Sequence, residues 1–70
     1  MKRDKFAQKI RELREALDLT QDQLAAKCGI TSRTIGAVER GRGCNLRTLQ
    51  ALAKGLEVDS FKLLHEDPTP

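Results

Sequence analysis

The stretch from Thr20 to Gly41 constrains the fold most, because it predicts two short helices joined by a tight turn. Thr20 suits the N-cap of the first helix, and Gln23 three residues later completes a capping box. Gly29 stands where the end of that helix needs a left-handed residue. Thr31 can cap the second helix, and a glycine closes the unit. The pattern therefore predicts a compact unit of two helices around one glycine turn.

Helical spacing continues on both sides of this unit. A first helix is expected over residues 4–17, where apolar residues recur on one side. A fourth helix is expected after a cap at Asn45, and a short fifth helix after Asp59 and Ser60. Gly55 either ends the fourth helix or lets another backbone approach closely. The buried faces of the first and fourth helices are marked by Phe6, Ile10, Leu13 and Leu17, and by Leu49, Leu52, Ala53 and Leu56. We therefore predict an all-α fold, a compact bundle of five helices.

The length of 70 residues allows one domain at most. We assign residues 1–65 to that domain and residues 66–70, EDPTP, to a flexible C-terminal tail. The net charge of +3 permits a nucleic-acid partner without requiring one. Phe6 and Phe61 are the only aromatic residues, which disfavours recognition of single strands by base stacking. The charged N-terminus and the lack of long apolar runs predict a cytoplasmic protein.

The sequence gives little support to catalysis or metal binding. Cys28 and Cys44 are the only cysteines, and His65 is the only histidine, so a zinc site of nitrogen and sulfur ligands cannot be assembled from one copy. We expect both cysteines to be reduced thiols. The sequence offers no Ser/His/Asp set and no phosphate-cradling glycine loop. We therefore predict no enzyme activity, no metal and no cofactor.

Two short helices with a glycine turn form the helix-turn-helix motif, here residues 20–41, whose second helix can enter a DNA major groove. On a helical wheel, Ile35, Val38 and Glu39 share the inward side of that helix. The outward side holds arginines and small residues, namely Arg33, Gly36, Ala37 and Arg40, with Ser32 at its edge. The alternative to a binding surface is a solvated polar face.

Each residue on the outward side has a specific chemistry toward DNA bases. Arg33 can donate two parallel hydrogen bonds to guanine, and Ser32 can donate to or accept from several bases. Ala37 could meet a thymine methyl group, while Gly36 and Ala37 are small enough to allow close approach to base edges. We therefore predict that Ser32, Arg33, Gly36 and Ala37 read bases.

The sequence resembles the lambda-repressor/Cro-like (XRE-type) helix-turn-helix family. The matching runs are IRELREALDLTQDQLAAKCGITSRTIGAVERG and LRTLQALAKGLEV, within residues 6–64. The closing piece KGLEVDSFKLL is most similar to restriction–modification controller proteins and phage repressors. The resemblance implies that Gln21 contacts the DNA backbone. It also implies an ion pair between Arg14 and Glu39 that holds the second helix of the motif at a fixed tilt.

Further contacts to the DNA backbone are expected around the ends of the recognition helix. Arg40, Arg42 and Asn45 flank its far end and can reach phosphates, which position the protein without reading sequence. Thr31 lies at its near end. We therefore predict backbone contacts for Gln21, Thr31, Arg40, Arg42 and Asn45.

These features predict a sequence-specific, double-stranded DNA-binding transcriptional regulator of the repressor or controller type, associated with the nucleoid when bound. A homodimer is expected, because one recognition helix reads only a few base pairs. The C-terminal part is crowded with apolar residues, so we assign the dimer interface to Leu56, Val58, Phe61 and Leu64. The alternative is an antitoxin-like or adaptor module whose main task is binding a protein partner.

Overall fold

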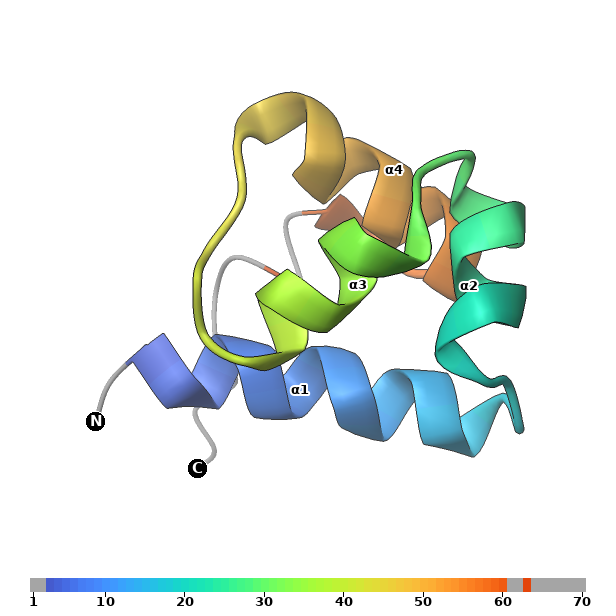
Figure 1. The fold of residues 1–70 in the computed structure, drawn as a ribbon, viewed down its shortest axis with the longest axis horizontal. Coiled ribbons are helices and arrows are strands. Elements are labelled where there is room, and N and C mark those ends of the chain that lie inside the picture. The colour runs from blue at the N-terminus through green and yellow to red at the C-terminus, as the bar shows by residue number, and fades with distance from the viewer. Residues whose placement is uncertain (1–2, 61–62, 64–70) are drawn as a thin grey trace.

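The computed structural model describes residues 3–60 and residue 63, which form four helices and no strand. The helices are α1 (Arg3–Ala16), α2 (Gln21–Cys28), α3 (Ser32–Glu39) and α4 (Leu46–Leu56). In Figure 1, α1 runs along the lower edge, α2 stands at its C-terminal end, and α3 lies at the centre of the molecule. Helix α2 packs against both α3 and α4, and α3 also packs on α1. The predicted all-α fold is confirmed, with four complete helices in the described part of the chain.

The expected fifth helix falls mostly outside the described residues. Ser60 and Leu63 are helical, and the Leu63 N–H donates to the Asp59 carbonyl at 3.3 Å. Residues 61, 62 and 64–70 lie outside the described residues, and so do the predicted interface residues Phe61 and Leu64. The difference in helix count therefore concerns only this short C-terminal segment.

Side-chain caps begin the three helices that follow α1. In each case a side-chain oxygen of the capping residue accepts a hydrogen bond from a backbone N–H in the first turn. The three bonds join Gln23 to Thr20 at 3.0 Å, Thr34 to Thr31 at 3.1 Å, and Thr48 to Asn45 at 2.8 Å. The Gln23 side chain also accepts from the Thr20 N–H at 2.8 Å, which completes the predicted capping box. Local sequence therefore decides where these helices begin.

Left-handed residues end the helices. Gly29 ends α2 with φ 75°, as the sequence predicts. Asp18 and Glu57 take the same conformation after α1 and α4, each with φ 62°, although neither is glycine. Backbone bonds from Leu19 to Arg14 and from Val58 to Ala53, at 3.1 and 2.9 Å, close these two ends as Schellman motifs. Helix α1 therefore stops at Ala16, which is earlier than predicted.

The core lies where the four helices meet. Its fully buried side chains come from every helix and are Ile10, Leu24, Ile35, Val38 and Leu52. Each predicted residue of the buried face of α4 is buried, and Leu63 joins the same cluster. Leu17 was expected on the inward stripe of α1 but is 37% exposed, one residue beyond the last residue of that helix.

Gly55 lies inside α4 and does not end it. A Cβ atom at this position would overlap Cys28 Sγ and would lie 3.3 Å from both Cα and Cβ of Cys28. Gly55 therefore lies where α4 packs tightly against Cys28 of α2. Of the two roles that the sequence leaves open for this glycine, the structure selects close helix packing.

Candidate nucleic-acid interface

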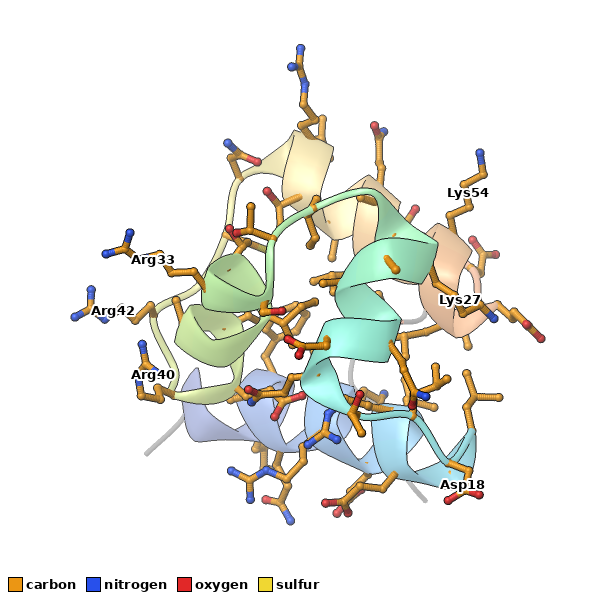
Figure 2. All side chains as sticks on the ribbon, turned by 45° about the vertical axis from the view of Figure 1, so that its right-hand side comes forward. Asp18, Lys27, Arg33, Arg40, Arg42 and Lys54 are labelled. Atoms are coloured by element: carbon orange, nitrogen blue, oxygen red, sulfur yellow. The ribbon has the colours of Figure 1, made fainter. Side chains whose placement is uncertain are left out.

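Three arginines gather on one side of α3 and the loop that follows it. Figure 2 shows the side chains of Arg33, Arg40 and Arg42 on the same side of the protein, with Arg33 and Arg42 extending away from it. All three are exposed, and none has a carboxylate partner among the residues that the structure describes. Guanidinium groups without internal partners keep all of their donors for a ligand, and their fork geometry suits phosphates and guanine.

The backbone fixes how two of these arginines are presented. Arg40 caps the C-terminus of α3, and Gly41 follows in a left-handed conformation with φ 90°. The Gly41 N–H donates to the Val38 carbonyl at 3.0 Å, and the Arg42 N–H donates to the Ala37 carbonyl at 3.1 Å. This is a Schellman motif, in which glycine is favoured at the left-handed position. It turns the chain back at the end of α3, so that Arg40 and Arg42 both remain beside that helix.

The N-terminus of α3 is already hydrogen-bonded within the protein. Thr31 is exposed, but its hydroxyl accepts from the Thr34 N–H and lies 3.0 Å from the Thr34 hydroxyl. The half-buried Ser32 donates its hydroxyl hydrogen to Oδ1 of Asp22, near the start of α2. Sequence reasoning missed Asp22, since the packing of α2 on α3 brings these two residues together.

Gly36 does not lie on an open outward face, and this corrects the sequence-based expectation. It is buried, and a Cβ atom there would lie 3.2 Å from Arg40 Nη1 and 3.8 Å from Gln21 Oε1. The side chains of Gln21 and Arg40 therefore lie close to this glycine. A helical wheel locates a residue on a helix but cannot show that neighbouring side chains cover it. Ala37, the other small residue, is half-buried.

The structure brings Arg14 and Glu39 together. Arg14 Nε donates to Glu39 Oε2 at 2.7 Å, and Arg14 Nη2 donates to Oε1 at 3.1 Å. The same guanidinium donates to the Leu19 carbonyl at 2.8 Å, so it also ties down the turn between α1 and α2. The side chains of Arg14 and Glu39 are 14% and 4% exposed. This is a shielded, bidentate ion pair between α1 and α3, which suits planar recognition of carboxylate by guanidinium.

Glu39 has two further partners that the sequence did not predict. Gln21 Nε2 donates to Glu39 Oε1 at 3.1 Å, and Arg11 Nε lies 4.0 Å from the same oxygen. Gln21 is exposed and therefore links the surface at the start of α2 to the buried carboxylate. This link depends on the three-dimensional meeting of α1, α2 and α3, and no sequence signal separates it from an ordinary surface glutamine.

The electrostatics of Glu39 follow from these contacts. Burial acts to raise the pKa of Glu39, but hydrogen bonds from Arg14 and Gln21 and the charges of Arg14 and Arg11 outweigh it, so the pKa is lowered. The hydrogen bond to Glu39 raises the pKa of Arg14. Glu39 is therefore a carboxylate at neutral pH, and the pair is charged.

Asn45 and the two cysteines take no part in the hydrogen bonds and ion pairs to Glu39. Asn45 is exposed and uses its Oδ1 to cap α4, which leaves its amide hydrogens for a ligand. Both cysteines are free thiols, Cys28 half-buried and Cys44 exposed, and burial raises the pKa of each. No group of three potential metal ligands occurs within the described residues. The helices of this part of the chain are too short or too polar to cross a membrane.

The predicted dimer interface is partly wrong. Leu56 is 2% exposed and belongs to the monomer core, because it lies on the same face of α4 as the buried Leu49, Leu52 and Ala53. Val58 is half-buried and packs against the same core. Leu46, at the start of α4, is 65% exposed.

Comparisons with known proteins agree with this architecture. A family model described as helix-turn-helix matches residues 10–63. An uncharacterized HTH-type transcriptional regulator of Methanothermobacter thermautotrophicus is 54% identical over 62 residues, covering 83% of this chain and 90% of its own. The uncharacterized HTH-type transcriptional regulator RghRB of Bacillus subtilis (strain 168) is 44% identical over 61 residues. That match covers 84% of this chain but only 44% of the Bacillus protein.

A solved structure is also similar. The crystal structure of the restriction–modification controller protein C.AhdI from Aeromonas hydrophila superposes with a TM-score of 0.83 and 38% sequence identity. The superposition covers 89% of this chain and 96% of the controller. The likeness therefore extends over nearly the whole of both chains.

Proposed function

The chain belongs to the lambda-repressor/Cro-like (XRE-type) helix-turn-helix family, and on that premise we propose that it reads a duplex DNA operator through α3 in the major groove. The observation that carries the proposal is the set of three exposed, unpaired arginines on one side of α3, Arg33, Arg40 and Arg42. The matched relatives are transcriptional regulators and a restriction–modification controller, which supports a role in transcription rather than an enzyme activity.

The proposed contacts divide into base reading and backbone positioning. Arg33 lies at the second residue of α3, where the recognition helix meets base edges, and it is proposed to donate to guanine. Ser32 and Ala37, which have smaller side chains, are proposed to contact neighbouring bases. Arg40 and Arg42 are proposed to bind phosphates at the C-terminal end of α3. Gln21, Thr31 and Asn45 are proposed to contact the DNA backbone from the helix starts.

The Arg14–Glu39 pair supports this proposal because it positions the reading helix. Glu39 is the last residue of α3, and its two bonds to Arg14 hold that end against α1. A recognition helix that contacts base edges needs a fixed orientation in the groove, since misplaced donors lose their hydrogen bonds. The buried Gly36 contributes by letting the side chains of Gln21 and Arg40 lie close to α3.

The protein is proposed to bind as a homodimer. One recognition helix contacts only a few base pairs, and two copies would read two half-sites about one helical turn, ~34 Å, apart. Leu46 is a large apolar side chain that the described part of the monomer leaves 65% exposed, which leaves apolar surface for a second copy to cover. Sedimentation with a duplex carrying two half-sites should show two chains per duplex, and one chain per duplex would overturn the dimer.

A binding-site selection followed by salt titrations tests the proposed function. Arg33→Ala should cost about 1–3 kcal/mol on the selected duplex and relax the preference at one base position per half-site. Arg42→Ala serves as the matched control, because it removes the same side chain from the loop. It should weaken all duplexes alike and lower the salt slope by roughly one unit.

The two variants make the assignments separable. An unchanged consensus for Arg33→Ala would show that Arg33 does not read a base. Lost selectivity with an unchanged salt slope for Arg42→Ala would contradict its phosphate role. A parent protein that selects no duplex at all would overturn the proposed function.

A further inference from the structure

Asp22 and Ser32 form a polar pair beside the proposed base-reading residue Arg33. Ser32 is the first residue of α3, and its hydroxyl donates to Oδ1 of Asp22 in the first turn of α2. Asp22 is exposed and has no cationic partner among the described residues. Its carboxylate therefore has only the Ser32 hydroxyl as a protein donor in this part of the structure.

The pair changes what Ser32 can offer to a base. A serine hydroxyl has one hydrogen and two lone pairs, so a free serine can either donate or accept. Here the single hydrogen is used by Asp22, and both Ser32 Oγ and the carboxylate retain only lone pairs. Arg33, the next residue, has donors only. The start of α3 thus presents an acceptor group and a donor group side by side.

Base pairs differ in where they present a hydrogen donor in the major groove. Adenine and cytosine carry an amino group there, whereas guanine and thymine present the O6 and O4 acceptors. An acceptor fixed over one strand therefore favours adenine or cytosine on that strand and opposes guanine or thymine. Electrostatic repulsion between the Asp22 carboxylate and a keto oxygen adds to this opposition.

We propose that Asp22 is a specificity-determining residue that fixes Ser32 as a hydrogen-bond acceptor. The Asp22–Ser32 pair then selects an amino base, adenine or cytosine, at the position adjacent to the guanine read by Arg33. This inference rests on the proposed function, because it needs α3 in the major groove. It adds an acidic residue of α2 to the reading surface.

Binding-site selection with the full chain tests this inference, using the parent, Asp22→Ala, Asp22→Asn and Ser32→Ala. The parent should prefer an amino base over a keto base at the adjacent position by about tenfold, the lower part of the range for a single base contact. Asp22→Ala frees the hydroxyl hydrogen, and Ser32→Ala removes the acceptor, so in both variants this preference should fall to about twofold or less. Asp22→Asn can still accept from Ser32 through its amide oxygen, so it should retain most of the preference.

The guanine position read by Arg33 serves as the internal control, since a variant that keeps it is folded and docked in the same register. Retention of the amino-base preference by Asp22→Ala would overturn the inference, and so would retention by Ser32→Ala. If Asp22→Asn lost as much of the amino-base preference as Asp22→Ala, the charge of Asp22 rather than its hydrogen bond with Ser32 would set that preference. This result would also overturn the inference. A parent without any consensus would instead refute the proposed function, on which the inference depends.

Discussion

Removing Arg14 is the substitution that tests the frame of this fold most directly. Arg14→Ala deletes both hydrogen bonds to Glu39 and the bond to the Leu19 carbonyl. It leaves a carboxylate whose side chain is 4% exposed in the parent, with Gln21 at 3.1 Å and Arg11 at 4.0 Å as its remaining partners. The carboxylate is then buried without adequate compensation.

The expected magnitude follows from that geometry. Breaking a buried pair from one side costs about 3–5 kcal/mol. Because Gln21 and Arg11 compensate part of the charge, we expect the lower end, about 3 kcal/mol in the free energy of unfolding. For a domain of this size each kcal/mol shifts Tm by about 4–8 °C, so Tm should fall by roughly 12–24 °C. A core this small supplies only about 3–5 kcal/mol of net stability, so the variant should be close to unfolding at room temperature.

Urea denaturation at low temperature, followed by the helical circular dichroism signal, measures this loss. The matched control is the double variant Arg14→Met/Glu39→Met, which replaces the pair with apolar side chains of similar length and should recover most of the stability. A loss under about 1 kcal/mol for Arg14→Ala is the size expected of an exposed ion pair and would refute the reasoning. A double variant as unstable as Arg14→Ala would show that the lost hydrogen bonds of Arg14, rather than the unpaired Glu39 charge, cause the loss of stability.

Three further predictions concern stability. The lowered pKa of Glu39 means that its carboxylate contributes its full stabilisation above the ordinary glutamate pKa of about 4.3 and loses it as the pH falls through the lowered pKa. The free energy of unfolding, measured against pH, should therefore decline in that acidic range. The decline should be smaller in Arg14→Met/Glu39→Met, which lacks this carboxylate. Gly55→Ala should lower the free energy of unfolding despite a helix-propensity gain of about 1 kcal/mol, because its Cβ would overlap Cys28 Sγ. Adding Cys28→Ala should restore part of the lost stability. A Gly55→Ala variant more stable than the parent would contradict the close packing of α2 on α4. Asp18→Gly should increase the free energy of unfolding by about 1 kcal/mol and so raise Tm, because glycine takes the left-handed conformation at lower cost. An unchanged Tm in thermal unfolding would argue against the left-handed φ of 62° at this position.

Local and non-local interactions determine different parts of this protein. Thr20, Thr31 and Asn45 cap their helices as predicted, because a cap depends only on side chains and N–H groups within one turn. Helical periodicity likewise identifies the buried faces of α3 and α4, since it needs only residues three and four positions apart. The two-helix motif around Gly29 therefore follows from the sequence by itself, and the family resemblance is carried by the same local pattern.

Tertiary structure decides the contacts that join one helix to another. The bond from Gln21 to Glu39, the pairing of Asp22 with Ser32, and the burial of Gly36 beneath its neighbours all depend on how α2 and α3 meet. Local pattern assigns a residue to a helix face, but which neighbours cover that face depends on the relative placement of whole helices, which is set by the packing of the entire core.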